Sequence, residues 1–172
     1  CNVERFADYG RFVAPDTIAV GAREIRAKHI VIATGARPRR ATMPGADLGI
    51  VSDGFFDLRA APRRVAIVGG GYISVELAGV LCALGSEVSV YARADRLLPG
   101  FDLELAVEVG QAMVLRGVGL HLGREPAAVE RDGEGYALRF ADGERAEGFD
   151  ALLWAIGRDP NVEALDLAQH GQ

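Results

Sequence analysis

The chain has 172 residues, of which 49% are hydrophobic, and a formal net charge of −5. This composition can supply the core of at least one domain, and without a basic stripe or a long charge run, nucleic acids and acidic membranes are poor partners. The two cysteines, Cys1 and Cys82, offer neither a disulfide framework nor a metal-ligand spacing, so we expect no metal site and favour a cytoplasmic location.

The N-terminal part of the chain predicts short strands. We expect a meander first, with strands at 10–13, 17–20 and 24–27. The apolar run 29–33 predicts a further, buried strand, and His29 at its start is interpreted as structural. The run ends at Thr34 and Gly35, whose small size allows close approach of another chain segment or of a ligand.

Residues 38–49 contain two prolines and two glycines and predict a linker. We interpret the arginines at 37, 39 and 40 as solvated. Ser52 then predicts the N-cap of a short helical turn over 53–58, in which Phe55 and Phe56 pack.

The stretch 65–78 predicts a strand, a glycine turn and a helix. Residues 65–68 are all apolar, as is typical of a parallel strand covered on both faces. Gly69 permits a sharp turn, and Gly71 leaves the main chain open to a ligand. The next helix would present unpaired N–H groups and the positive end of its dipole to this turn. A pyrophosphate suits this arrangement best.

The surrounding sequence supports a βαβ unit. Ser74 takes the third position of the G-x-G-x-x-G pattern, where it is small enough for a helix to pack on the strand. Gly85 predicts the end of the helix, and 87–91 predicts the second strand. A membrane-spanning helix over 65–85 is disfavoured by three consecutive glycines and by Glu76. A glycine turn that binds no ligand is a second alternative.

The remaining sequence extends this pattern. Asp102 predicts the N-cap of a helix over 103–116, which Gly117 ends, and 118–122 predicts a third parallel strand. A β-meander is expected from segments at 129–131, 136–140 and 145–148, before a last apolar strand at 151–156 and a polar tail with weak helical signal. We therefore expect an α/β fold, with a Rossmann-like parallel sheet and a β-meander.

The end of the strand 87–91 indicates which dinucleotide is bound. NAD-binding units usually place an acid there for the ribose 2′-OH, but here no acid is present and Arg93 follows. A guanidinium binds phosphate oxygens in pairs, and we expect Arg96 to join Arg93 at a 2′-phosphate. In the alternative, both arginines are simply exposed, and Asp95 would repel the same phosphate. The sequence predicts NADP over NAD.

Three longer runs, at 48–56, 69–79 and 152–161, point to a family. They resemble runs of glutathione reductase, a pyridine nucleotide-disulfide oxidoreductase, and the segments 33–35 and 84–86 agree. The glycine and Thr-Gly motifs are common to the wider flavoenzyme family. The first and third runs are narrower and are similar to glutathione and trypanothione reductases.

The resemblance implies a division of the chain. Residues 1–37 would belong to a FAD-binding domain, 38–157 would form the NADP-binding domain, and 158–172 would return to the FAD-binding domain. The parent protein would pass electrons from NADPH through FAD and a redox-active cysteine pair to glutathione disulfide, as a homodimer joined by a C-terminal domain. We expect this chain alone to be a fragment without FAD, catalytic residues or disulfide reductase activity.

The resemblance also implies roles for single residues. Tyr72 would cover the nicotinamide pocket until NADPH displaces it, and Glu76 would lie near the nicotinamide. Arg93 matches the first phosphate-binding arginine of the family, whereas Pro99 stands where the second is usual, and Arg96 would substitute for it. The cofactor-binding candidates are Thr34, Gly35, Gly69, Gly71, Tyr72, Ile73, Glu76, Arg93, Arg96, Ile156, Gly157 and Arg158.

Two kinds of alternative are open. One is a trypanothione, lipoamide or ferredoxin-type reductase of the same architecture, although a lipoamide-type protein should carry an acid at position 92, where Ala stands. The other is a non-catalytic module that binds NADP.

Overall fold

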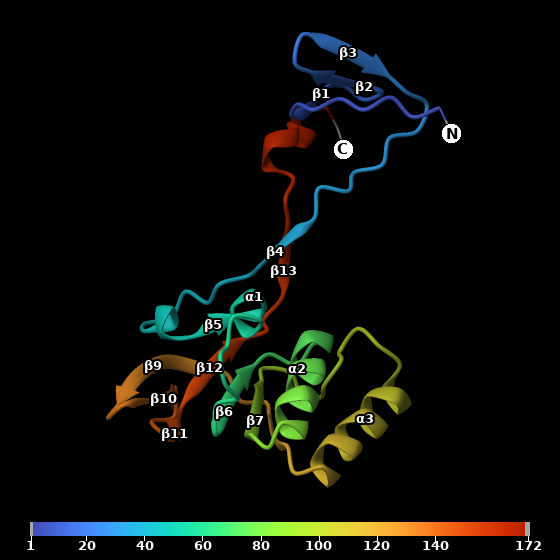
Figure 1. Ribbon diagram of the computed structural model, residues 1–172. Coiled ribbons are helices and arrows are strands. Elements are labelled where there is room, and N and C mark those ends of the chain that lie inside the picture. Colours follow the sequence, from blue (N-terminus) through green and yellow to red (C-terminus); the bar gives the residue numbers. More distant parts are fainter. Residues whose placement is uncertain (1, 171–172) are drawn as a thin grey trace. The chain divides into compact units, whose positions relative to one another are not determined.

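The computed structural model describes residues 2–170 and divides into two compact units (Figure 1). The larger unit spans Pro38–Arg158 and contains the glycine turn. The smaller unit combines the residues up to Arg37 with those from Asp159 onward.

The centre of the larger unit is a five-stranded sheet in the order β5-β12-β6-β7-β8. All of its neighbouring strands are parallel, which confirms the predicted parallel sheet. The strands are Ile50–Val51 (β5), Arg64–Val68 (β6), Glu87–Ala92 (β7), Gly119–Leu122 (β8) and Ala151–Trp154 (β12). Strand β6, which leads into the glycine turn, therefore has a hydrogen-bonded neighbour on each side.

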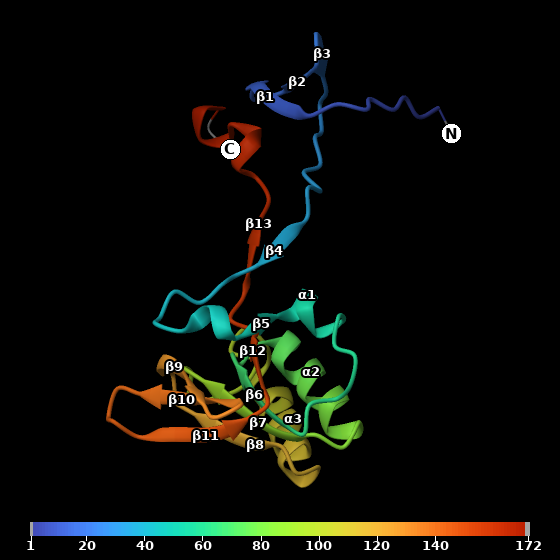
Figure 2. The same ribbon diagram turned by 60° about the vertical axis from the view of Figure 1, so that its left-hand side comes forward.

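Two layers cover the two faces of this sheet (Figures 1 and 2). One layer holds the helices α2 (Tyr72–Ala83) and α3 (Leu103–Leu115), and the other holds the antiparallel meander of β9 (Pro126–Asp132), β10 (Gly135–Phe140) and β11 (Arg145–Phe149). Along β6, Val65 and Ile67 pack with the helices, whereas Ala66 and Val68 pack with the meander. Side chains alternate between the faces of a strand, so both faces need apolar residues here. The predicted α/β fold is confirmed.

The helix ends follow the sequence. The side chain of Asp102 accepts hydrogen bonds from the backbone N–H groups of Glu104 and Leu105, at 3.0 and 3.2 Å, which confirms the predicted N-cap. Helices α2 and α3 stop before Gly85 and Gly117, as predicted. No helix within residues 2–170 has the length and apolar character needed to cross a membrane.

The predicted cap at Ser52 is wrong. Ser52 is the first residue of α1 (Ser52–Phe55), and the capping position belongs to Val51, which has no side-chain cap. Val51 is extended because it ends β5, so the sheet fixes where the helix begins. Phe55 packs against the helix-side core as predicted, but Phe56 is 79% exposed.

The predicted linker, residues 38–49, is part of the larger unit and packs against its strands. It contains a 3₁₀ helix, Ala46–Leu48, whose first carbonyl accepts a hydrogen bond from Nε1 of Trp154 at 2.8 Å. The carbonyl of Pro44 accepts a second bond from the backbone N–H of Val129 at 2.9 Å. Both contacts join residues distant in sequence, so composition alone could not predict them.

The smaller unit contains the predicted antiparallel meander. Its strands are β1 (Gly10–Ala14), β2 (Thr17–Val20) and β3 (Arg23–Arg26), and two 3₁₀ helices follow at Glu163–Leu165 and Leu167–His170. The strand predicted at 29–33 is absent, and Val31 is 86% exposed. A strand is held by hydrogen bonds to a neighbour, and within residues 2–170 no strand pairs with this run.

Arg37 is not simply solvated. Its guanidinium donates hydrogen bonds to both carboxylate oxygens of Glu163 and to Asn161 at 3.1 Å. These bonds lower the pKa of Glu163 to about 2. The short strands β4 (Ala36–Pro38) and β13 (Arg158–Pro160) pair with each other and were missed, since three residues carry no readable periodicity.

Candidate functional site

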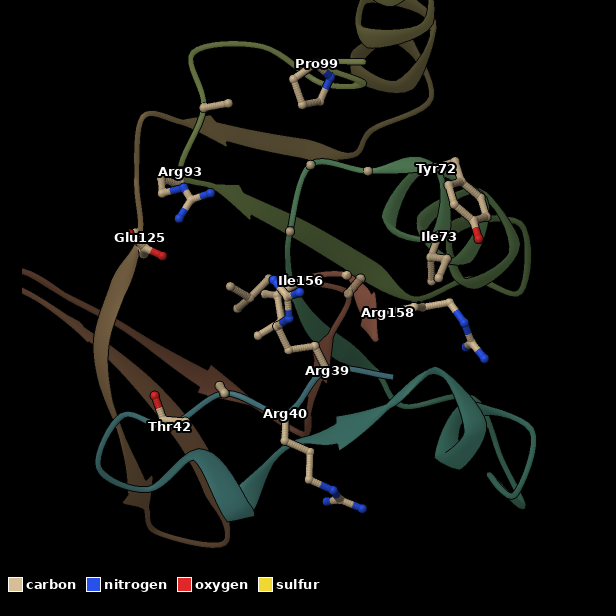
Figure 3. A pocket seen from close by; sticks show the side chains of 18 of the residues that line it. Arg39, Arg40, Thr42, Tyr72, Ile73, Arg93, Pro99, Glu125, Ile156 and Arg158 are labelled. Carbon is tan, nitrogen blue, oxygen red and sulfur yellow. The ribbon is translucent and has the colours of Figure 1, made fainter. Parts of the chain in front are cut away.

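A pocket of about 600 Å³ opens in the larger unit at the carboxyl edge of the parallel sheet (Figure 3). The glycine turn after β6, the loops after β7, β8 and β12, and the segment 39–43 line it. In open α/β sheets this edge is where ligands bind, because the loops that follow the strands gather there.

The first and third glycines of the turn serve different purposes. Gly69 has a φ of +133°, and a Cβ there would lie 2.2 Å from the carbonyl oxygen of Ala155, so only glycine fits. Gly71 has an ordinary φ of −85°, and a Cβ there would meet nothing within 4 Å. The first glycine therefore allows the turn, and the third keeps the space beside it open.

The N-terminus of α2 adjoins this open space. Its N-cap is Gly71, which offers no side-chain acceptor, and the first turn contains no acidic residue. The first N–H groups of the helix thus lack a side-chain partner and carry the positive end of its dipole. Such a donor set beside open space fits the pyrophosphate of a dinucleotide. Tyr72 and Ile73, at the helix start, also line the pocket.

Charged side chains lie at both ends of the pocket. Arg93, in the loop after β7, directs its guanidinium into the pocket, and Glu125, after β8, lies on the same side (Figure 3). Tyr72 and Arg158 lie on the opposite side (Figure 3). A guanidinium near the end of the second βαβ strand is the group that suits a 2′-phosphate.

A model of the pyridine nucleotide-disulphide oxidoreductase family matches residues 2–172. The chain belongs to this family. It is 40% identical to a glutathione reductase of Burkholderia cepacia, over 96% of this chain and 37% of the relative, and 36% identical to one of Nostoc sp., over 99% and 37%. Among solved structures, the HOCl-induced flavoprotein disulfide reductase RclA from Escherichia coli superposes with a TM-score of 0.74 at 27% identity.

These comparisons confirm the resemblance inferred from sequence. They also show that the chain spans only 37% of the length of those two glutathione reductases, and the superposition covers 95% of this chain and 38% of RclA. The chain thus corresponds to little more than a third of the length of these three proteins.

Most of the sequence-predicted site residues of this family member meet in one place. Those that line the pocket are Gly69, Gly71, Tyr72, Ile73, Arg93, Ile156, Gly157 and Arg158. Glu76 is exposed and Arg96 is half-buried, and neither lines the pocket. Nη2 of Arg96 donates a hydrogen bond to the carbonyl of Pro99 at 2.8 Å, so its guanidinium folds back on its own loop. The roles of Glu76 and Arg96 stay predictions.

Thr34 and Gly35 belong to the smaller unit. The carbonyl of Thr34 accepts a hydrogen bond from Nδ2 of Asn161 at 3.2 Å, and the carbonyl of Gly35 accepts one from the backbone N–H of the same asparagine at 2.9 Å. The close approach expected there is thus made by another chain segment. Their cofactor-binding role stays a prediction.

Sequence reasoning missed several pocket residues. Arg39 and Arg40, interpreted as solvated, both line the pocket, as do Thr42 and Glu125. The backbone N–H of Arg39 donates to the carbonyl of Gly157 at 2.9 Å, which holds the segment 39–43 beside the end of β12. No local spacing signals this pairing. Within residues 2–170, no cluster of His, Cys, Asp and Glu could hold a metal ion.

Aromatic groups pack together on β7, β8 and β10. The buried ring of Tyr91 stacks on His121 with ring centroids 4.4 Å apart. Burial raises the pKa of Tyr91, whereas partial burial and the nearby Arg124 lower the pKa of His121. Arg124 itself lies over the ring of Phe140 at 4.2 Å.

Proposed function

We propose that this chain is the NADPH-binding part of a flavin-dependent disulfide reductase of the glutathione reductase type. The observation that carries the proposal is the uncapped N-terminus of α2 beside the open space at Gly71, within a pocket that Arg93 enters. The family match and the named relatives support the wider assignment.

The residues of the pocket would share the work of binding. The backbone at Gly69 and Gly71 and the first N–H groups of α2 would hold the pyrophosphate. Arg93 would take the 2′-phosphate. Ile156, Gly157 and Tyr72 would bound the nicotinamide side and exclude water from it. NADPH, when bound, supplies a hydride; the chain binds and orients it.

The domain assignment is part of the same proposal. The larger unit, Pro38–Arg158, would be the NADP-binding domain, and the smaller unit would belong to the FAD-binding domain, with Thr34 and Gly35 near the flavin. The parent protein would pass electrons from NADPH through FAD and a cysteine pair to glutathione disulfide, as a cytoplasmic homodimer. By itself this chain would neither retain FAD nor reduce a disulfide.

The test is a calorimetric titration of NADPH and of NADH into this chain. We expect NADPH to bind at least about tenfold more tightly, with a margin that shrinks at high salt. Arg93→Gln should remove most of that margin, because it removes the guanidinium that would bind the 2′-phosphate. Arg93 is exposed, so its loss should leave the fold unchanged. Arg116→Gln, an equal charge change at the exposed end of α3, is the matched control and should keep the margin. If neither dinucleotide binds, the proposal is wrong for this chain.

A further inference from the structure

Glu125 is held beside Arg93 by the backbone. Strands β7 and β8 pair in parallel, with Ala92 opposite Leu122. Past their ends, the N–H of Arg124 donates to the carbonyl of Ala92, and the N–H of Gly123 donates to the carbonyl of Ala94, both at 2.9 Å. These two bonds bracket Arg93, so the loop after β8 enters the pocket next to it.

The orientation of this loop decides which charge faces the pocket. The guanidinium of Arg124 donates hydrogen bonds to Asp142 at 2.5 Å and to Glu144 at 2.6 Å, over the ring of Phe140. The Arg124 side chain is thus bound to the turn between β10 and β11 and does not line the pocket. The next residue, Glu125, does line it, on the same side as Arg93 (Figure 3). The loop therefore presents an acid, not a base, to this end of the pocket.

At this end of the pocket, Glu125 therefore offsets the charge of Arg93. Arg93 contributes one positive charge and Glu125 one negative charge. Pro99 lines the pocket without a charge, and Arg96 is held on the Pro99 carbonyl outside it. A 2′-phosphate carries a double negative charge and is repelled by a neighbouring carboxylate. A ribose 2′-OH, in contrast, can donate a hydrogen bond to a carboxylate.

We propose that Glu125 sets the choice between the two nicotinamide dinucleotides in this pocket. It weakens binding of the 2′-phosphate at Arg93 and offers an acceptor to the 2′-OH of NADH, so the preference for NADPH is smaller than Arg93 alone would give. This inference rests on the proposed function, since it assumes that the adenosine end of a dinucleotide lies between Arg93 and Glu125.

The experiment compares the unaltered chain with Glu125→Gln. The matched control is Glu134→Gln, which removes the same unit charge from the exposed turn between β9 and β10. Calorimetry gives the dissociation constants of NADPH, NADH, 2′,5′-ADP and 5′-AMP at low and high salt. Like charges a few ångströms apart in a partly exposed site change affinity by about three- to tenfold.

We expect Glu125→Gln to tighten NADPH and 2′,5′-ADP by about three- to tenfold. It should leave NADH and 5′-AMP unchanged or weaken them by about two- to threefold, through loss of a charged acceptor. The gain for NADPH should shrink at high salt, and Glu134→Gln should alter none of the four constants.

The outcomes separate the two proposals. If the unaltered chain binds neither dinucleotide, both fall together. If it binds NADPH but Glu125→Gln leaves the NADPH to NADH ratio within about twofold, the inference is overturned and the proposed function stands. An equal gain for both dinucleotides would also overturn it, because Glu125 would then repel the pyrophosphate rather than select at the 2′ position.

Discussion

Two apolar runs of this chain, both rich in β-branched residues, differ in structure: one forms a buried strand and the other forms no strand. Residues 65–68 form most of β6, lie between β12 and β7, and are covered on both faces. Residues 30–32, Ile-Val-Ile, form no strand, and Val31 and Ile32 are 86% and 43% exposed. The two runs have similar composition, so the difference lies in their surroundings. Hydrogen-bonded neighbours and covering layers turn an apolar run into a strand.

The largest expected difference between the runs is in amide hydrogen exchange. The amides of 65–68 open only with the larger unit, whereas those of 30–32 have no ladder to break. Exchange in 30–32 should therefore be at least about a thousandfold faster, relative to its intrinsic rate. Mass spectrometry or NMR measures this directly. Equal protection of the two runs would contradict the proposed importance of neighbours.

The same substitution should have unequal effects in the two runs. Ile67 is fully buried, so Ile67→Ala should lower the free energy of unfolding by about 2–5 kcal/mol. The matched variant Ile32→Ala, at a 43% exposed site, should change it by no more than about 0.5 kcal/mol. Urea denaturation of both variants tests the contrast. A large loss from Ile32→Ala would mean that the run 30–32 is packed in solution.

The two functional glycines extend the comparison to single positions. Gly69→Ala would force a Cβ against the Ala155 carbonyl at a φ of +133°, and should cost about 1–3 kcal/mol of stability or more. Gly71→Ala has an ordinary φ and open space, so stability should stay within about 0.5 kcal/mol. Its Cβ would instead fill space beside the helix N-terminus and weaken NADPH binding. Parallel denaturation and titration would separate the two effects, and equal stability losses would contradict this division.

Local signals explain what the sequence could predict. The β6 run, the glycine turn and the Asp102 cap are encoded within a few residues of each other, and the structure has them where expected. Ser52 failed as a cap because β5, a strand of two residues, occupies the position before it.

The missed pocket residues show the limit of such signals. Arg39 and Glu125 line the pocket only because Gly157 and Ala92 hold their segments by backbone hydrogen bonds across the sheet edge. Such pairings join segments far apart in sequence, and no spacing rule in one sequence reports them. The glycine motif thus predicts where a pocket forms, but not the charges of all its walls.

Two buried serines should change stability in opposite directions, and the first of them is Ser74. It is a fully buried residue of α2, and its hydroxyl has no hydrogen-bond partner among the described residues. A buried hydroxyl without a partner costs stability, so Ser74→Ala should raise the free energy of unfolding by about 1 kcal/mol. Ser86 is also buried, but its hydroxyl donates to the Pro62 carbonyl at 2.6 Å.

The matched variant Ser86→Ala should therefore lower the free energy of unfolding by about 1 kcal/mol, because it leaves the Pro62 carbonyl without its hydrogen-bond donor. Thermal and urea unfolding of both variants give the two signs. Losses of similar size from both would show that the Ser74 hydroxyl finds an acceptor in solution. Opposite changes in the free energy of unfolding would show that the surroundings determine whether a buried serine hydroxyl stabilises the fold. The surroundings likewise determine whether an apolar run becomes a strand.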